Sequence, residues 1–332
     1  MSCRRASLHI AVINCDTPVP HVLAARGLCS DIFASLLRRA TEFYADWKTT
    51  ELVFTAYDAV KGELPLQQDL EKLDGLFLSG STASAYDPTP WVVKLASFLT
   101  NTYHNNPSVR LVGSCFGHQI ICHAIFSPYS SSVGSSITLP SPSSTISLAS
   151  SLSPLPSVVS QDPKGWKLGL HDISLSPQFL SHFGPVPSNP ASPSQMRLRF
   201  THADHVILPS LPSDFLSVGR SEHCALQGLY KTGRVLTFQG HPEYDEWINI
   251  EMITSYGATI WTEEVLQEAL EKLKKGEDDS LYAARVMLDF LVEEAAEQVD
   301  AAGKIEMLLD EKLPMAVAHS HKCLGMDPAK NW

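Results

Sequence analysis

The chain has few charged side chains, and acidic ones outnumber basic ones. Of 332 residues, 18% are charged and 44% are hydrophobic, and 36 acidic against 25 basic side chains give a net charge of −11. This apolar content is enough to bury a large core, which excludes a mostly disordered protein. The shortage of basic side chains leaves no broad cationic surface for phosphate backbones. We therefore expect no nucleic acid partner.

Paired cysteines and long apolar runs are also missing. The seven cysteines are odd in number and include no C-x-x-C pair, which argues against a disulfide framework and against a zinc ribbon. No stretch approaches the roughly 18 apolar residues of a membrane helix, and the run at 8–13 is short and interrupted by a histidine. We therefore expect a soluble cytoplasmic protein with no membrane partner, no cofactor and no metal.

The first 127 residues alternate short β-rich runs with segments of helical period, which predicts an α/β fold with a parallel sheet covered on both faces. Ser30 is the expected N-cap of one amphipathic helix. Asp87 and Pro88 are the expected cap and first residue of a second helix. A third is expected from 116 to about 126. The expected strands are 8–13, 51–57, 75–79 and 109–113.

The composition changes after residue 127. Residues 128–163 are rich in serine and proline and predict a disordered insertion, and 184–194 predict a shorter, loosely held one. The later β-type runs are closely spaced, which predicts hairpins at 166–175, 197–201, 215–219, 225–230 and 234–239. Helices are expected at 263–275 and 280–298. We expect one domain over 1–300 and a polar tail over 301–332.

Residues 109–119 have the pattern of a nucleophile elbow, in which an apolar strand is followed by G-x-C-x-G and a helix. Gly113 and Gly117 leave room for a sharp turn that lifts Cys115 off the strand. The helix N-terminus favours a thiolate, and the N–H group of Phe116 points to where an oxyanion would form. The alternative is that Cys115 is a small buried apolar residue. Cys122, further along the helix, is expected to pack.

A thiol nucleophile needs a base, and that base needs a group that fixes its tautomer. His241 and Glu243 follow a β-type run and are separated by a proline, which holds its predecessor extended, so both side chains can point the same way. The alternative is a surface His-Pro-Glu turn. His202, Asp204 and His205 resemble a ligand cluster but lack a distant third ligand, so no metal site is expected.

Six motifs in this order resemble the class I, or triad, glutamine amidotransferase superfamily. The resemblance implies a flavodoxin-like, doubly wound, mostly parallel sheet with helices on both faces and added β-hairpins. It implies that Cys115 attacks the γ-carbonyl of a glutamine-like substrate, with His241 and Glu243 completing a triad. The motifs are 8–13, 74–81 (DGLFLSGS), 113–119 (GSCFGHQ), 165–169 (GWKLG), 202–206 (HADHV) and 238–243 (FQGHPE).

The resemblance also implies that Gln119 contacts the substrate and that the turn of Gly80 and Ser81 supplies the second oxyanion N–H group. The family's glutaminase subunits more often have Ser-Gly-Gly-Pro at this turn, whereas Ser-Gly-Ser is similar to stand-alone members, including plant γ-glutamyl peptidases. The block at 115–119 is similar to guanylate-synthesis glutaminases. The sequence contains no nucleotide-binding P-loop.

These features favour a stand-alone cysteine hydrolase or transferase that cleaves a γ-glutamyl amide bond through a thioester. Its small-molecule substrate would be glutamine or a γ-glutamyl peptide or thiol conjugate. One alternative is a glutaminase subunit that delivers ammonia to a separate protein. Another is a non-catalytic or repurposed binding module.

Overall fold

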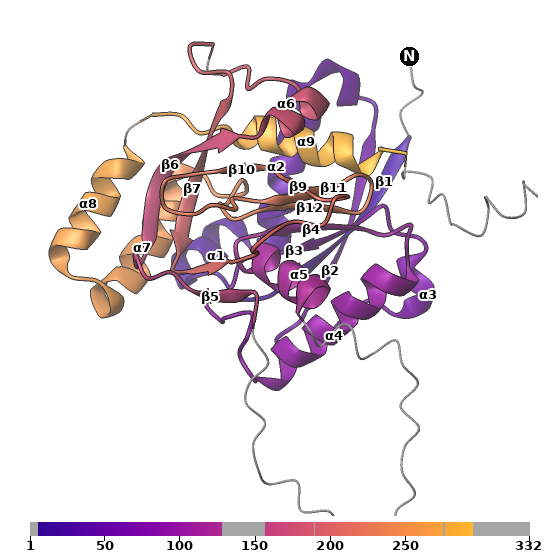
Figure 1. Ribbon diagram of the computed structural model, residues 1–332, viewed down its shortest axis with the longest axis horizontal. Helices are drawn as coiled ribbons and strands as arrows, with labels where there is room; N and C mark the ends of the chain where they lie inside the picture. Colours follow the sequence, from indigo (N-terminus) through magenta and orange to yellow (C-terminus); the bar gives the residue numbers. More distant parts are fainter. Residues whose placement is uncertain (1–5, 128–156, 189, 275, 295–332) are drawn as a thin grey trace, which may run out of the picture. The chain divides into compact units, whose positions relative to one another are not determined.

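The computed structural model describes residues 6–127, 157–188, 190–274 and 276–294. Within these residues the main sheet has seven strands in the order β2-β1-β3-β4-β12-β11-β9. The strands from β2 to β12 are paired in parallel, and β11 and β9 extend the sheet with antiparallel pairs (Figure 1). Their bounds are β1 (Ser7–Asn14), β2 (Glu51–Asp58), β3 (Gly75–Leu78), β4 (Arg110–Ser114), β9 (Leu216–Ser217), β11 (Leu229–Lys231) and β12 (Val235–Phe238).

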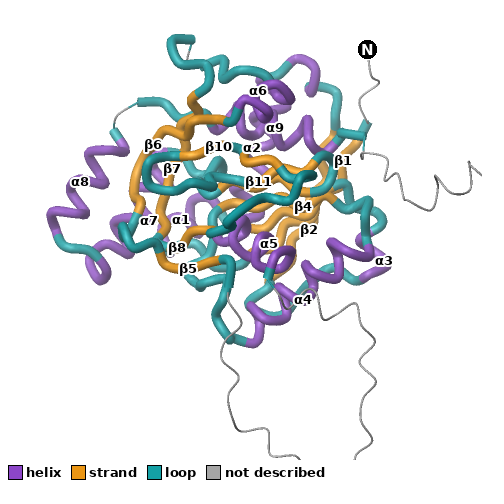
Figure 2. The backbone as a smooth tube through the Cα atoms, viewed as in Figure 1, coloured by secondary structure: helices purple, strands orange, loops and turns teal. Residues whose placement is uncertain are grey.

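Helices cover both faces of this sheet, with α2 and α9 on one side and α4 and α5 on the other (Figure 2). Successive side chains of β1 alternate between two cores: Val12 packs with the first pair of helices and Ile13 with the second. This explains why β1 is apolar at consecutive positions from Ile10 to Ile13. The helices are α1 (Pro20–Arg26), α2 (Cys29–Phe43), η1 (Ala45–Trp47), α3 (Gln67–Leu70), α4 (Pro90–Asn105), α5 (Phe116–Phe126), α6 (Pro177–Phe183), α7 (Glu246–Ile260), α8 (Glu263–Leu273) and α9 (Ser280–Leu291).

Smaller antiparallel sheets are added to this frame, as the hairpin patterns predict. A three-stranded sheet has the order β10-β6-β7, and β5 pairs with β8. An isolated bridge between Arg199 and His241 ties β7 to the chain that follows β12. The flavodoxin-like α/β prediction is therefore confirmed. The added strands are β5 (Val159–Gln161), β6 (Lys167–Leu175), β7 (Gln195–His202), β8 (Asp204–Val206) and β10 (Gly219–Arg220).

Two predicted helix starts are wrong by a few residues. Ser30 lies inside α2, where its N–H group donates to the Asn14 side chain at 2.8 Å, while the Asp31 carboxylate accepts the N–H group that precedes the helix. Asp87 accepts a bond from the backbone of a preceding turn, and α4 begins instead at Pro90. Ser30 thus bonds to a distant residue and Asp87 to a preceding turn, and neither caps its predicted helix.

The two predicted insertions are each described in part. Residues 157–163 are described and contain β5, whereas 128–156 lie outside the described residues, as does the predicted tail at 301–332. In the segment 184–194, Val186 is buried in the main core and its N–H group donates to the Pro193 carbonyl at 2.9 Å. The described residues of this segment thus form a loop, and Val186 anchors it to the main core.

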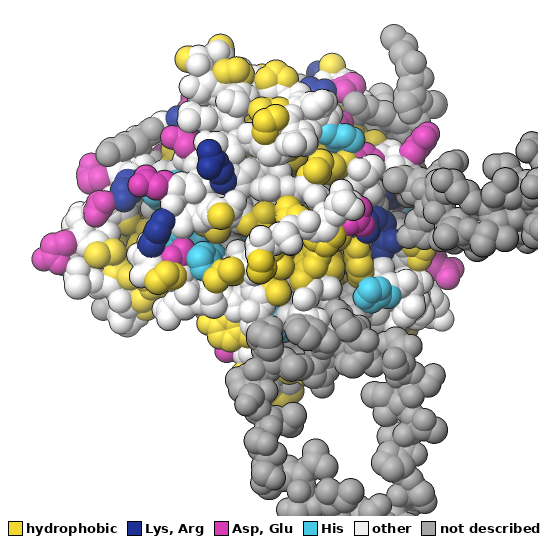
Figure 3. Space-filling view, viewed as in Figure 1, with side chains coloured by type: hydrophobic (Ala, Val, Ile, Leu, Met, Phe, Trp, Pro, Cys, Tyr) yellow, Lys and Arg dark blue, Asp and Glu magenta, His cyan; other side chains and the backbone are white. Residues whose placement is uncertain are grey.

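Charged side chains are sparse on the face shown in Figure 3, and acidic ones gather at the edge formed by α8. Four glutamates of this helix are exposed, which is expected of a solvated helical face. In the described ranges, none of the helices combines the length and the hydrophobicity required to cross a bilayer.

Candidate active site

Cys115 lies at the junction of β4 and α5 in a strained conformation, with φ 51° and ψ −111°. In the part of the chain that the structure describes, it is the only residue other than glycine with a positive φ. The flanking glycines are sterically required: a Cβ on Gly113 would lie 2.5 Å from backbone atoms of Gly117, and one on Gly117 would lie 2.3 Å from the Leu78 carbonyl oxygen. Such strain persists only where surrounding structure enforces it, often at functional sites.

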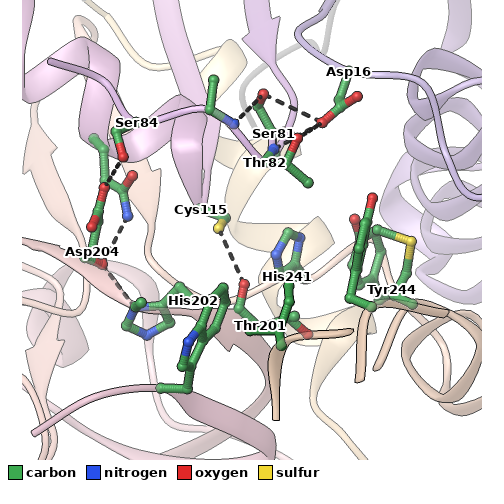
Figure 4. A pocket seen from close by; sticks show the side chains of 18 of the residues that line it. Asp16, Ser81, Thr82, Ser84, Cys115, Thr201, His202, Asp204, His241 and Tyr244 are labelled. Atoms are coloured by element: carbon green, nitrogen blue, oxygen red, sulfur yellow. Dashed lines mark hydrogen bonds between the residues drawn. The ribbon is translucent and has the colours of Figure 1, made fainter. Parts of the chain in front are cut away.

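His241 reaches Cys115 because β12 and β4 are parallel neighbours whose carboxyl ends meet at one edge, with Phe238 in register with Ser114. The Nδ1 atom of His241 lies 2.8 Å from Glu243 Oε1. The Tyr244 ring stacks on the imidazole with centroids 4.0 Å apart, so the ring is held in one orientation (Figure 4). The structure thus brings together the predicted Cys115, His241 and Glu243.

The protonation state of His241 follows from the residues around it. Burial alone would lower the pKa of His241, but the Cys115 thiolate and the Glu243 carboxylate raise that pKa to about 10. A raised imidazole pKa means that the proton stays on His241 at neutral pH. The arrangement therefore favours an imidazolium between two anions, which is a state ready to donate a proton.

Ser114 connects the carboxylate to the strand that carries the cysteine. Its buried hydroxyl donates to Glu243 Oε1 at 2.9 Å, which is the oxygen that His241 also contacts. The second oxygen, Oε2, is buried and has no hydrogen-bond partner among the described residues. Ser114 is therefore the neutral donor that fixes the position of Glu243.

We expect Ser114→Ala to lower kcat/KM of any Cys115-dependent reaction by roughly 10- to 100-fold, because hydrogen bonds to charged groups are worth about 1.5–3 kcal/mol. Without this donor the carboxylate attracts the imidazolium more strongly, so the alkaline limb of the pH–rate profile should move to higher pH. Ser114→Thr should restore both quantities, and Thr100→Val is the control, since Thr100 buries a hydroxyl bonded to Ala124 outside the site. An unshifted alkaline limb would contradict this role.

The predicted oxyanion groups lie beside the cysteine. Phe116 is the first residue of α5, so its N–H group has no acceptor within the helix. A Cβ on Gly80 would lie 3.7 Å from that of Cys115, which places the turn of Gly80 and Ser81 next to the nucleophile. Asp16 holds this turn: its Oδ2 atom accepts bonds from Thr82 N at 2.8 Å and from Ser81 Oγ at 3.5 Å.

These side chains open into a cavity of about 450 Å³. Gln119 lines it and donates from Nε2 to the Asp204 carbonyl oxygen at 2.9 Å. Trp166 and Trp261 form part of the wall in an edge-to-face contact of 5.1 Å between ring centroids. The cavity therefore has both polar and aromatic lining residues.

The other singled-out residues have local roles. His202 bonds to the Asp204 carbonyl oxygen at 2.8 Å, and His205 Nδ1 lies 3.1 Å from Asp162. No three His, Cys, Asp or Glu side chains within the described ranges are arranged to hold a metal ion. Cys122 is fully buried, as predicted for a packing residue.

Sequence reasoning missed three residues of the site: Asp16, Ser114 and Tyr244. Ser114 stands inside the elbow motif and Tyr244 directly follows Glu243, so proximity was a usable signal for both. Asp16 follows β1, and only the pairing of β1 with β3 brings it to the oxyanion turn.

No family model matches the chain, but individual proteins do. It is 29% identical to a glutamine amidotransferase-like protein of Schizosaccharomyces pombe, over 86% of this chain and 99% of the relative. It is 26% identical to gamma-glutamyl peptidase 2 of Arabidopsis thaliana, over 71% of this chain and 80% of the relative. The curated relatives that the chain resembles are thus named glutamine amidotransferase-like proteins and gamma-glutamyl peptidases.

Solved structures share the fold of this chain. A glutamine amidotransferase from Thermotoga maritima superposes with a TM-score of 0.56 and 16% identity, covering 87% of this chain and 100% of the other. A second, from Methylobacillus flagellatus, gives a TM-score of 0.51 and 16% identity, covering 89% and 99%. At these identities the likeness supports the flavodoxin-like fold alone.

Proposed function

We propose that this protein hydrolyses γ-glutamyl amide bonds through a γ-glutamyl thioester on Cys115. The observation that carries the proposal is the strained elbow of Cys115 beside the bonded pair of His241 and Glu243. A thiolate next to an imidazolium is an activated nucleophile with its proton donor in place. The names of the Arabidopsis relatives support a γ-glutamyl substrate.

The reaction would have two halves. The Cys115 thiolate attacks the γ-carbonyl carbon, and the N–H groups of Phe116 and Ser81 stabilise the oxyanion. His241 gives its proton to the amide nitrogen, the C–N bond breaks, and the amine leaves a thioester. His241 then takes a proton from water, the hydroxide displaces the thiolate, and glutamate is released. Glu243 stays ionised throughout and orients the imidazole.

The size of the cavity is an argument for a substrate larger than free glutamine. Its volume of about 450 Å³ lies in the range of sites for drug-sized ligands, whereas glutamine is much smaller. Asp204 supplies a carboxylate to pair with the α-ammonium group of a γ-glutamyl substrate, and Gln119 lies beside it. The remaining space beside His241 would hold the group attached to the departing nitrogen.

The test is release of p-nitroaniline from L-γ-glutamyl-p-nitroanilide by the wild type, with the α-linked isomer as the control for linkage. We expect Cys115-dependent cleavage of the γ-linked compound only. L-Glutamine is offered separately. Glutamate release from glutamine without anilide cleavage would favour the glutaminase alternative, in which a separate protein accepts ammonia. Cleavage of neither compound would contradict the proposal.

A further inference from the structure

The charges that line the cavity are of one sign. Asp16 and Asp204 contribute carboxylates, and no Lys or Arg is found among the described lining residues. His202 adds no positive charge because burial holds its pKa well below the ordinary range. The imidazolium of His241 is matched by its own anionic neighbours. The lining therefore carries two carboxylates and no Lys or Arg among its described residues to pair with them.

The two carboxylates lie on opposite sides of the nucleophile. In Figure 4, Asp204 lies on one side of Cys115, and His241 and Asp16 lie on the other. The contacts agree: Gly80 lies against the His241 ring, and the adjoining Ser81 is bonded to Asp16. Since His241 would protonate the departing nitrogen, the leaving group lies on the side of Asp16 and the glutamyl group on the side of Asp204.

Asp16 has no cationic partner among the described residues. Each of its described hydrogen-bond donors is uncharged: the N–H groups of Thr17 and Thr82 and the hydroxyls of Ser81 and Thr82. Asp16 also acts on Tyr256. Burial, and to a smaller extent the charge of Asp16, raise the pKa of the Tyr256 phenol to about 12. Asp16 is only partly exposed to solvent, and a carboxylate whose partners are all neutral keeps an unpaired negative charge.

The wall on this side suits cations and neutral groups. Tyr244, Met252 and Tyr256 line the cavity, and they pack with Val19, which follows Asp16 by three residues. Aromatic faces attract ammonium groups, and apolar side chains accept uncharged ones. Neither feature stabilises an anion.

We propose that Asp16 selects the leaving group, so that the preferred substrates are γ-glutamyl amides of uncharged or cationic amines rather than of amino acids or peptides that carry a carboxylate. The proposal rests on the proposed function. A carboxylate on the leaving group would lie near Asp16 without a cation, and such like-charge contacts exclude ligands strongly.

The test compares two matched pairs of substrates. We expect kcat/KM for γ-glutamylglycinamide to exceed that for γ-glutamylglycine by about tenfold or more, and γ-glutamyl-1,4-diaminobutane to exceed γ-glutamylbutylamine severalfold, from one charge interaction at an effective dielectric near 20. Asp16→Asn keeps an acceptor for Thr82 and removes the charge, so both preferences should fall to about twofold or less. Asp204→Asn is the matched control and should raise KM for all four compounds while leaving the two ratios unchanged.

Equal kcat/KM within each pair in the wild type would overturn the proposal, as would ratios that survive Asp16→Asn. Cleavage of none of the four compounds would count against the proposed function itself, which keeps the two failures distinct. A measurement without variants guards against misfolding: 1,4-diaminobutane should inhibit wild-type anilide cleavage competitively at concentrations where glycine does not. Inhibition of equal strength by both amines would contradict selection by charge.

Discussion

Replacing Cys115 with serine should reduce γ-glutamyl anilide cleavage by about 10⁴-fold or more, because removal of a nucleophile that acts as a unit with its base has effects of this size. A serine hydroxyl in the same strained turn would lack the readily formed anion on which attack depends. The check is kcat under saturating substrate, with the free energy of unfolding measured for both proteins. Folding should be preserved, since the substitution changes one atom.

Cys224→Ser is the matched control. Cys224 is also buried, but it does not line the cavity, and its thiol donates to the Leu226 carbonyl oxygen, which a hydroxyl can replace. The control should keep wild-type activity. Mass spectrometry of wild type quenched during turnover should find one glutamyl group on the peptide that contains Cys115. Near wild-type turnover by Cys115→Ser would contradict the thioester mechanism.

The elbow could be predicted from sequence because its requirements are local. Gly113 and Gly117 stand where any Cβ would collide with backbone, and Cys115 stands between a strand and a helix that are both visible in the pattern. The approach of His241 could be predicted for a related reason. Ends of parallel strands meet at one edge of a sheet, so a histidine after β12 can reach a cysteine after β4.

The supporting contacts could not be predicted, because they depend on strand order and side-chain direction. Asp16 holds the oxyanion turn only because β1 and β3 are neighbours, which no residue pattern encodes. Side chains along β4 point alternately to the two faces of the sheet, but the sequence does not show that the Ser114 hydroxyl contacts Glu243. Such contacts between separate elements are decided by tertiary packing.

Amino-acid composition was a poor guide where strand pairing stabilises a segment with few apolar residues. The end of the Ser/Pro-rich insertion has little apolar surface, yet Val159 is buried and β5 pairs with β8. The backbone hydrogen bonds of a neighbouring strand do not depend on side-chain type. α7 was missed because its apolar residues pack in two separate clusters: Ile248 near Tyr244, and Ile253 against α8. A single amphipathic stripe is therefore absent.

Two histidines line the cavity, and their surroundings decide which of them is the expected acid and base. Burial keeps His202 neutral despite its bond to the Asp204 carbonyl oxygen, whereas the anions around His241 keep that residue protonated. Only a protonated imidazole can give a proton to the departing amine, so His241 is the expected acid. His202→Gln should change kcat by less than about tenfold, the lower bound for losing a positioned acid or base being about 100-fold.

His241→Ala should lower kcat by roughly a thousandfold or more, because general acid–base catalysis and the ion pair with the thiolate are lost together. The wild type should also show a pH dependence of defined sign. The acid form of His241 is active, so kcat/KM should fall as the pH rises through the His241 pKa of about 10, and the residual activity of the variant should lack this fall. Profiles from pH 6 to 11, a range of about five units around that pKa, measure both. A mild loss in His241→Ala with a severe loss in His202→Gln would reassign the base to His202.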